Sequence, residues 1–301
     1  MQNNLPSLKI VSSFYKYVKI DNLLEFQQEH LQFCLLLGLK GRILLGEEGI
    51  NGCVYGTKDQ IEKYKNELRK NLLFSDIEFK DTYTEKPAYR KMFVRLRKEV
   101  VYSGLDIDLK KTGKFLTPAQ LKEMLDNEED IVLVDMRNEY EFNIGRFRNA
   151  VALPMKNFRE LPQAVKKIES LKDKRIVAYC TGGIRCEKAS AYLNEIGFKD
   201  VSQIKGGILK YGEEFPDTYW EGKCFVFDDR LAIQINKNNV ESLTECIWCK
   251  RKCDDYMNCH NLDCDKLFTC CENCTERYNK SCCEECSIAP KRRKEILTIE
   301  N

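Results

Sequence analysis

The sequence contains only two histidines among its 301 residues. Non-haem iron oxygenases bind iron through two histidines and one carboxylate, so this scarcity argues against such a site. No flavin-binding or haem-binding pattern is present, and we therefore expect no organic cofactor. The net charge is only +2, so bulk electrostatic attraction to nucleic acid is not expected and any such binding site has to be local.

Long apolar runs are also absent, and none approaches the length that crosses a membrane. Residues 1–6 lack the basic and apolar regions of a secretory signal peptide. The chain nevertheless contains 16 cysteines, and without a secretion signal these indicate reduced thiols and metal ligands rather than disulfides. We therefore expect a cytoplasmic protein, long enough for about two domains and a small third.

The most informative stretch is residues 179–187, which reads Tyr-Cys-Thr-Gly-Gly-Ile-Arg-Cys-Glu. An apolar run precedes it and an amphipathic run follows, an order typical of a strand, a tight loop and a helix. Cys180, at the end of the strand, would then point its sulfur into a bowl of backbone N–H groups at the helix N-terminus. Such a bowl stabilises a thiolate, and Arg185 adds a fixed positive charge.

The length of this loop limits the kind of group that it can bind. Four residues separate Cys180 from Arg185, whereas phosphatase-type loops have five and form a wider bowl for a phosphoryl group. The shorter loop resembles that of the rhodanese superfamily, in which the cysteine carries a persulfide. Cys180 and Arg185 are therefore the candidate catalytic residues, and the loop backbone comprises Thr181, Gly182, Gly183, Ile184 and Cys186.

Two points about these cysteines stay open at the level of sequence. Cys180 has one alternative interpretation, a buried structural cysteine in a glycine turn. Cys186 is either a resolving partner of Cys180 or a small packing residue. Because Cys186 lies one helical turn inside the next element, we expect its side chain to face away from the bowl.

Residues 1–102 show the periodicity of a compact domain. Alternation over residues 13–20 predicts a strand, and apolar residues at three- and four-residue steps predict a helix that Gly38 ends. Strands at 42–45 and 53–55, a helix capped by Thr57, and strands at 77–82 and 92–101 complete the pattern. The order β-α-ββ-α-β predicts a ferredoxin-like, or acylphosphatase-like, sandwich.

The glycine-rich segment 46–52 invites comparison with phosphate-binding loops. It lacks the Lys-Ser/Thr ending of such loops, and Glu47 and Glu48 would repel a phosphate. A hairpin turn is the better interpretation.

The last strand of this domain carries a candidate RNA-binding face. Phe93, Arg95 and Arg97 alternate with apolar residues and point to one side. Exposed aromatic rings interleaved with arginines can stack on unpaired bases and neutralise phosphates. The alternative is a solvated strand face covered by Lys and Arg side chains.

Residues 103–228 form the second predicted domain. After a polar connector at 103–114, the apolar run 131–134 predicts a parallel strand buried on both faces. The motifs that follow stand in the order of the rhodanese superfamily: Asp135-Met136-Arg137, Glu141-Phe142, Gly145-Arg146-Phe147, Ala150 and Leu153-Pro154. The chain departs from that superfamily at Arg146, where histidine is usual, and at Phe147. The resemblance implies a rhodanese α/β domain in which Asp135 and Arg137 pair with neighbouring groups as a scaffold.

Residues 229–301 form a small cysteine-rich module, with eleven cysteines between positions 246 and 286. Three cysteine pairs have a two-residue spacing, with which one knuckle can chelate a tetrahedral ion. Two four-cysteine sites are predicted, with the ligands Cys246, Cys249, Cys259, Cys264, Cys271, Cys274, Cys283 and Cys286. Cys253 or His260 could replace a member. Structural zinc is the preferred ion because the segment is too small to fold without support; iron–sulfur ligation and free thiols are the alternatives.

The three parts in this order resemble one bacterial family, the rhodanese-domain tRNA uridine(34) hydroxylases. The resemblance covers nearly the whole chain and rests on the paired cysteines and on residues 46–52, 158–162, 180–186 and 225–230. It implies oxygen-dependent 5-hydroxylation of the wobble uridine, with molecular oxygen as co-substrate and the tRNA anticodon loop as partner. The residue that it implies as catalytic is Cys180.

The residues make this chemistry intelligible in two ways. C5 of uracil is a poor nucleophile until a group adds to C6, and a Cys180 thiolate could add there. Alternatively, Cys180 carries a persulfide that takes part in oxygen activation. A plain sulfurtransferase and a zinc-stabilised RNA-binding module with a vestigial rhodanese loop are the competing functions. The sequence identifies neither the electron source nor the oligomeric state.

Overall fold

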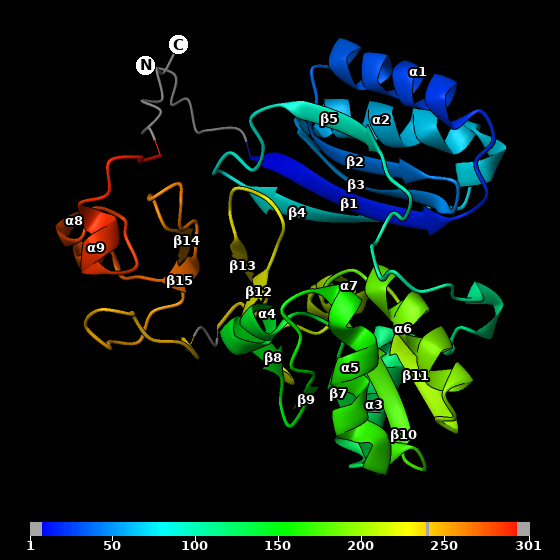
Figure 1. The fold of residues 1–301 in the computed structure, drawn as a ribbon. Helices are drawn as coiled ribbons and strands as arrows, with labels where there is room; N and C mark the ends of the chain where they lie inside the picture. The colour runs from blue at the N-terminus through cyan, green and yellow to red at the C-terminus, as the bar shows by residue number, and fades with distance from the viewer. Residues whose placement is uncertain (1–7, 239–240, 294–301) are drawn as a thin grey trace.

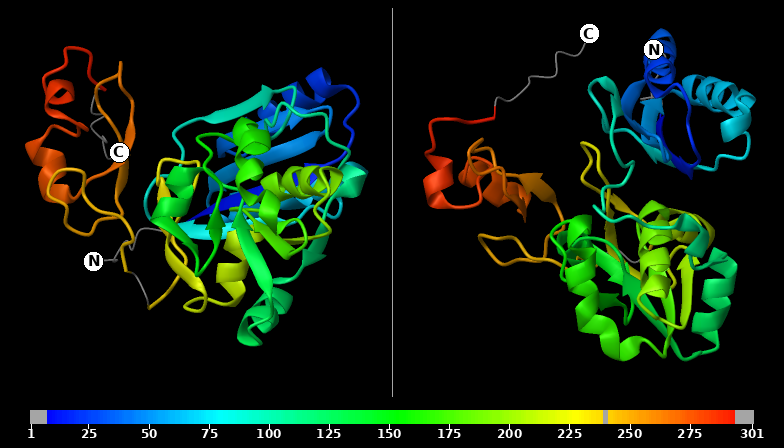
Figure 2. Two further views of the ribbon diagram at one scale, coloured as in Figure 1. Left: turned by 60° about the horizontal axis from the view of Figure 1, so that its bottom comes forward. Right: turned by 45° about the vertical axis from the view of Figure 1, so that its right-hand side comes forward.

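A computed structural model describes residues 8–238 and 241–293, and residues 1–6, discussed above for their lack of a signal peptide, lie outside these ranges. The described chain has three parts: an N-terminal domain, a central domain and a cysteine-rich module (Figure 1). In the views of Figures 1 and 2 the cysteine-rich module lies to one side of the other two parts. Among the described residues, no helix is long and apolar enough to cross a membrane.

The N-terminal domain is a five-stranded sheet with two helices on one face (Figure 1). Its elements are β1 (Lys9–Tyr17), α1 (Leu23–Leu36), β2 (Lys40–Gly46), β3 (Gly49–Gly56), α2 (Lys58–Lys70), the 3-10 helix η1 (Leu72–Phe74), β4 (Phe79–Thr84) and β5 (Met92–Leu96). The strand order is β4-β1-β3-β2-β5. The predicted acylphosphatase-like fold is therefore confirmed, with β5 as an additional edge strand parallel to β2.

Local sequence explains how these elements begin and end. Thr57 starts α2 with a capping box, in which its side chain accepts from the Gln60 N–H and the Gln60 side chain accepts from the Thr57 N–H. Gly46 pairs with Gly49 across the β2–β3 turn, so the glutamates between them form the predicted hairpin turn. Gly49 has a φ of +145°, and a side chain there would meet the Lys16 carbonyl.

The expected strand at 92–101 is shorter in the structure. It ends at Leu96. The Arg97 N–H still donates to the Leu45 carbonyl of β2 at 2.8 Å, but further along, the backbone bonds to side chains of the hairpin. The Val100 N–H donates to Glu48 Oε1 at 2.7 Å, and Asn51 Nδ2 donates to the Val100 carbonyl at 2.8 Å. The strand predicted at 77–82 is displaced by two residues to Phe79–Thr84.

The central domain contains a parallel sheet in the order β6-β11-β10-β7-β9. Its strands are β6 (Lys114–Leu116), β7 (Ile131–Asp135), β9 (Val151–Ala152), β10 (Arg175–Tyr179) and β11 (Asp200–Ile204). The helices are α3 (Pro118–Asp126), α4 (Glu139–Ile144), α5 (Leu161–Val165), α6 (Ile184–Glu195) and α7 (Gly207–Glu214), with 3-10 helices η2 (Leu109–Lys111), η3 (Phe158–Glu160) and η4 (Lys166–Leu171). Alternate residues of β7 and β10 enter two apolar clusters, one with α5 and α6 and one with α3 and α7. This explains the uninterrupted apolar run at 131–134.

Three short strands extend the central domain towards the C-terminal end of the chain. They are β8 (Gly145–Phe147), β12 (Trp220–Phe225) and β13 (Ala232–Gln234), and they form a sheet in the order β13-β12-β8. Because β13 pairs with β12, this sheet continues past residue 228 to Gln234.

The cysteine-rich module contains β14 (Tyr256–Asn258), β15 (Leu267–Thr269), α8 (Glu272–Arg277) and α9 (Glu284–Ser287). Its buried cluster consists of six cysteines and Phe268, so it has almost no conventional apolar core. All 16 cysteines of the chain are free. Cysteine side chains, rather than large apolar side chains, therefore fill most of its interior.

Contacts between the parts involve charged and polar groups. Lys188 of α6 has a nearly buried ammonium, which lies 2.9 Å from Glu48, 2.7 Å from Glu99 and 3.1 Å from the Val101 carbonyl. The segment after β12 returns to the N-terminal domain, where the Asp229 N–H donates to the Ala88 carbonyl at 2.9 Å. These contacts hold the N-terminal sheet against the central domain.

Candidate active site

The loop 180–183 lies where β10 ends and α6 begins. The N–H of Gly183 donates to Cys180 Sγ at 3.2 Å, as the bowl interpretation requires. Gly183 has a φ of +104°, and a Cβ at this position would lie 2.8 Å from Tyr15 Oη. Glycine is required here for its backbone conformation and for the close approach of the N-terminal domain.

Cys180 is almost completely buried, at 1% exposure, yet its thiol is acidic. Burial opposes ionisation, but a hydrogen bond from the Cys186 thiol, the charge of Arg185 and two backbone N–H groups outweigh it. Together they lower the pKa of Cys180 from 9.0 to about 5, so the residue is a thiolate at neutral pH.

The expectation that Cys186 faces away from the bowl is wrong. Its thiol contacts Cys180, because the first turn of α6 wraps around the sulfur and turns this side chain towards it. Burial and the neighbouring Cys180 thiolate raise the pKa of Cys186 well above 9, so it stays protonated and acts as a donor.

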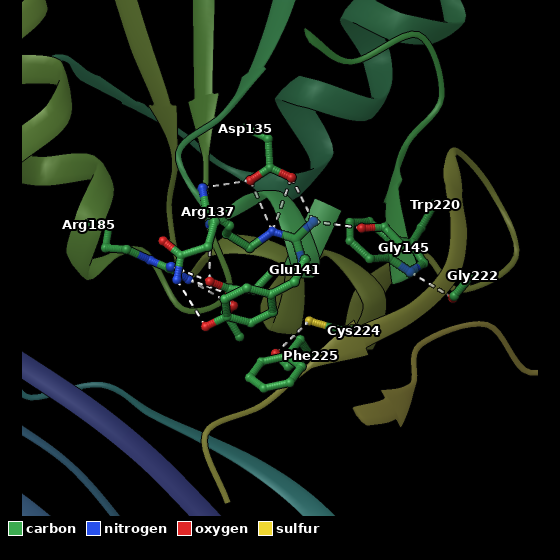
Figure 3. A network of polar contacts seen from close by, with 12 residues as sticks. Asp135, Arg137, Glu141, Gly145, Arg185, Trp220, Gly222, Cys224 and Phe225 are labelled. Atoms are coloured by element: carbon green, nitrogen blue, oxygen red, sulfur yellow. Dashed lines mark hydrogen bonds and ion pairs between the residues drawn. The ribbon is translucent and has the colours of Figure 1, made fainter. Parts of the chain in front are cut away.

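Arg185 is held by an acidic partner on α4 (Figure 3). Its two terminal nitrogens donate to the Glu141 carboxylate at 2.6 and 2.8 Å, and Glu141 is fully buried. This bidentate pair fixes the guanidinium beside the loop. Arg185 therefore supplies a positioned charge to Cys180 rather than open donors for a ligand. The sequence motif contains Glu141, but its partnership with Arg185 depends on the fold.

Asp135 and Arg137 form a second buried pair next to it (Figure 3). Arg137 donates to both carboxylate oxygens of Asp135, at 2.6 to 3.1 Å, and to the Gly145 carbonyl at 2.6 Å. Neither residue lines the cavity described below. Their geometry connects the end of β7 to β8, which fits the scaffold role expected from the sequence.

Cys180 opens into a cavity of about 380 Å³ between the N-terminal and central domains. This volume lies within the range of small-ligand pockets. Most of its lining comes from the helix-free face of the N-terminal sheet, the cysteine loop, and residues 226–230 after β12. Residues 101–102, 138, 157–158, 209 and 233 complete it. The polar lining residues are Ser13, Tyr15, Arg42, Asn51, Lys80, Thr82, Tyr89, Tyr102, Asn138, Asn157, Thr181, Arg185, Asp228 and Arg230.

The N-terminal sheet contributes groups that sequence reasoning missed. Tyr17 Oη donates to the Ile184 carbonyl at 3.3 Å, and Tyr15 forms a hydrogen bond with Glu187. Burial and the neighbouring carboxylate raise the pKa of Tyr15 far above its usual value, so it stays protonated. The only sequence signal was the alternation of residues 13–20, which places both tyrosines on the face away from Phe14.

Comparison with known proteins accounts for this combination of parts. Residues 9–100 match the UPF0176 acylphosphatase-like domain, residues 117–214 the rhodanese-like domain, and residues 221–287 the rhodanese C-terminal family. A tRNA uridine(34) hydroxylase of Bacillus licheniformis is 43% identical over 284 residues, covering 92% of this chain and 88% of the relative. One of Cytophaga hutchinsonii is 43% identical over 282 residues, covering 93% and 90%.

The chain belongs to the tRNA uridine(34) hydroxylase family. The resemblance drawn from the sequence motifs is thus confirmed. Among solved structures, a rhodanese-related protein from Thermoplasma volcanium is 26% identical, covering 34% of this chain and 92% of that chain with a TM-score of 0.29.

In this family member, the candidate RNA-binding residues lie apart from the Cys180 cavity. Phe93 is 40% exposed on the edge strand β5, and Arg95 and Arg97 are exposed beside it. The Arg95 guanidinium lies 4.7 Å from the centre of the Phe93 ring. None of the three lines the cavity.

The cysteine-rich module of this family member brings eight cysteines into two clusters. One contains Cys246, Cys249, Cys271 and Cys274, and the other Cys259, Cys264, Cys282 and Cys286. Within each cluster the sulfur atoms lie within 4.8 Å of one another. A tetrahedral ion with sulfur ligands at about 2.3 Å sets sulfur atoms about 3.8 Å apart, so each cluster fits a single metal ion.

The prediction that Cys283 is a metal ligand is wrong, because its sulfur atom lies in neither cluster. Cys282 Sγ lies 3.6 Å from Cys264 Sγ and 3.9 Å from Cys286 Sγ, whereas Cys283 is the N-cap residue of α9 and belongs to neither cluster. The two-residue spacing of Cys283 and Cys286 suggested a knuckle. The short helix α9 instead places Cys282 and Cys286, four residues apart, on the same side.

Proposed function

We propose that this protein hydroxylates C5 of uridine 34 in tRNA, with Cys180 as the catalytic residue. The family membership supports the substrate and the reaction. The observation that carries the catalytic assignment is a cysteine ionised at neutral pH that lines a cavity between two domains. Burial alone would have kept this thiol protonated, so the hydrogen bonds and charge that oppose burial indicate a reactive group.

The thiolate has a direct role in this chemistry. Addition of the Cys180 sulfur to C6 of uracil makes C5 electron-rich, and C5 can then react with an oxidant. We propose molecular oxygen as that oxidant, with the second oxygen atom leaving as water at the expense of two electrons from an external donor. Arg185, held by Glu141, keeps the sulfur anionic before addition.

The substrate base reaches this cavity without melting a duplex. A wobble base lies in the anticodon loop and is unpaired, so it can be turned into a pocket at modest cost. We propose that the face formed by Phe93, Arg95 and Arg97 contacts another part of the same tRNA, because an aromatic ring and two arginines suit a nucleic-acid strand. A cytoplasmic location follows from the tRNA substrate.

For the two four-cysteine clusters we propose structural zinc. Four thiolates at tetrahedral spacing, with no open ligand position, are typical of zinc sites that hold small modules together. The module has almost no apolar core, so metal binding supplies the folding free energy that packing cannot.

The test is mass spectrometry of tRNA nucleosides after incubation of unmodified tRNA with purified protein, oxygen and a reductant. The parent protein is expected to form 5-hydroxyuridine at position 34, and Cys180→Ser to form none. Cys34→Ala is the matched control, because Cys34 is a buried thiol of the N-terminal core with its pKa raised by burial to about 12. A Cys180→Ser protein that hydroxylates at the parental rate would reject the catalytic assignment. Transfer of sulfur from thiosulfate without uridine modification would identify a sulfurtransferase instead.

A further inference from the structure

Lys80 of β4 is a buried lysine from the N-terminal domain that lines the same cavity as Cys180. It pairs in register with Ser13 of β1, so both side chains lie on the face of the sheet that borders the cavity. The residue is only 7% exposed. Its Nζ lies 4.8 Å from the centre of the Tyr15 ring, and among the described residues it has neither a hydrogen bond nor an ion pair.

Other buried lysines of this protein are fully partnered. Lys65, which is also 7% exposed, is bonded to Asp81 at 2.5 Å and Glu62 at 2.9 Å. A buried ammonium without an acceptor is unfavourable for folding. Burial accordingly lowers the pKa of Lys80 to about 8, which leaves most of it protonated at neutral pH. A contribution to stability therefore does not explain why a lysine occupies this position. A negatively charged ligand group in the cavity would explain it.

The other charged groups nearby are already engaged. Arg185 and Arg230 are bound to Glu141 and Asp228, and Arg42 lies exposed at the cavity wall. The titratable groups that influence Lys80 are Glu78, Lys210, Cys53, Cys180 and Glu187. Among these, Glu78 is bonded to Lys205 at 2.6 Å, Glu187 is bonded to Tyr15, and burial keeps Cys53 protonated. Among the described residues, Lys80 is thus the buried cation of this cavity that is not paired with a carboxylate.

We propose that Lys80 is a catalytic residue whose ammonium stabilises negative charge in this cavity, on Cys180 before addition and on the uracil O4 atom after it. This inference rests on the proposed function. When the S–C6 bond forms, the electron pair of the C5–C6 double bond moves into conjugation with the C4 carbonyl, and the negative charge is shared between C5 and O4. The Lys80 N–H donates to O4 at that point. The step consumes no oxidant and no reductant, and a donor aimed at developing charge lowers the barrier more than it strengthens binding.

The test compares Lys80→Met, Lys80→Arg and Lys65→Met with the parent protein. Lys80→Met removes an unpaired buried charge and keeps the side-chain length, so its melting temperature is not expected to fall. Its kcat for hydroxylation is expected to fall about 100-fold or more while its dissociation constant for tRNA changes less than about threefold. Lys80→Arg should retain part of the activity because it keeps the charge. Lys65→Met, a buried lysine away from the cavity, should keep the parental kcat.

Two results would overturn the role of Lys80: an unchanged kcat in Lys80→Met, or a loss confined to tRNA affinity, which would indicate a phosphate contact. A second readout is independent of hydroxylation. The rate of Cys180 alkylation against pH, followed by peptide mass spectrometry, should show a higher midpoint in Lys80→Met than in the parent.

These readouts distinguish failure of the inference from failure of the proposed function. A parent protein that forms no 5-hydroxyuridine would reject the proposed function. The alkylation midpoint would still decide whether Lys80 stabilises an anion in the cavity. Identical midpoints in the parent and Lys80→Met would show that it does not.

Discussion

At the scale of single residues, the ionisation of Cys180 depends on its neighbours more than on its burial. A thiol at 1% exposure without partners would be protonated, as Cys34 and Cys224 are, with pKa values raised to about 12. Cys180 differs because positive or positively polarised groups surround its sulfur. They are the Cys186 thiol, the Arg185 guanidinium and two backbone N–H groups. The largest of these favourable contributions comes from Cys186.

Replacing Cys186 with Ala should therefore raise the pKa of Cys180 from about 5 towards its usual value. The sign follows from the loss of a hydrogen-bond donor to the charged form. Alkylation of Cys180 by iodoacetamide, measured against pH by peptide mass spectrometry, would show a midpoint at higher pH. Cys186→Ser is the matched control, because its hydroxyl still donates and its midpoint should shift less. Equal midpoints in all three proteins would contradict this role of Cys186.

At the scale of elements, β5 combines an apolar face with a face that suits nucleic acid. Met92 and Val94 are buried against the helices, while Phe93, Arg95 and Arg97 are exposed. Within the part of the chain that the structure describes, β5 is an edge strand, and one side of its backbone has no neighbouring strand. In a nearly neutral protein, this exposed basic edge is the local surface on which the proposed RNA contact depends.

Changing Arg95 and Arg97 together to Ala should weaken tRNA binding roughly tenfold at low salt. The slope of log affinity against log salt concentration should fall by about 2, one for each lost phosphate contact. Stability should change by less than about 0.5 kcal/mol because both side chains are exposed. Filter binding at several salt concentrations measures both effects. Lys166→Ala with Lys167→Ala, an exposed pair on η4, removes the same charge as a control, and an equal loss there would refute a specific β5 contact.

The turn before α9 decides which cysteine completes the second cluster. Cys282→Ser should lower the metal content from about two ions per chain to about one, because its sulfur lies within the cluster. Cys283→Ser should keep both ions, because Cys283 belongs to neither cluster. Elemental analysis of the purified proteins provides the measurement, and the adjacent residues serve as controls for each other. A loss in Cys283→Ser with full content in Cys282→Ser would reverse the assignment.

At the scale of the whole molecule, the cavity exists only where the N-terminal and central domains meet. Lys188 fixes that meeting point, since it lies in α6 directly after the cysteine loop and binds two carboxylates of the N-terminal domain. Domain docking and active-site assembly therefore depend on the same charged network. Removing a buried ammonium of this kind lowers the free energy of unfolding, because its carboxylate partners then remain without a counter-charge.

Lys188→Met should destabilise the protein by roughly 3 kcal/mol, because it leaves Glu48 and Glu99 without their cation. Urea unfolding at pH 7 measures this change, and Lys174→Met, which breaks an exposed pair with Asp130, should cost less than about 1 kcal/mol. A loss no larger than that of Lys174→Met would show that Lys188 does not hold the domains together.

The Lys188 network also predicts a pH dependence. Burial opposes ionisation of Glu99, but Lys188 and neighbouring N–H groups lower its pKa from 4.5 to about 2. A depressed carboxyl pKa stabilises the fold above pH 4.5, and this contribution is lost as the pH falls towards 2. The parent should therefore lose stability between about pH 5 and pH 2 more steeply than Lys188→Met does, as urea unfolding at several pH values would measure.

Features that lie in one continuous segment could be predicted from the amino-acid sequence. The loop 180–186, the capping box at Thr57 and the hairpin turn at 46–49 are local, because each depends on residues within a few positions of one another. The order of strands and helices predicted the acylphosphatase-like fold, and the resemblance of the motifs at 135–154 and 180–186 implied the rhodanese fold. These patterns required no knowledge of distant contacts.

The way in which distant segments combine became visible in the folded chain alone. Lys80 and Tyr15 line the Cys180 cavity from strands that begin more than a hundred residues earlier, and no periodicity in those strands indicates a partner in the central domain. The pair of Glu141 with Arg185 and the choice of Cys282 over Cys283 depend on how helices α4, α6 and α9 are placed. Long-range side-chain contacts arise from packing, and packing is a property of the whole folded chain rather than of any segment.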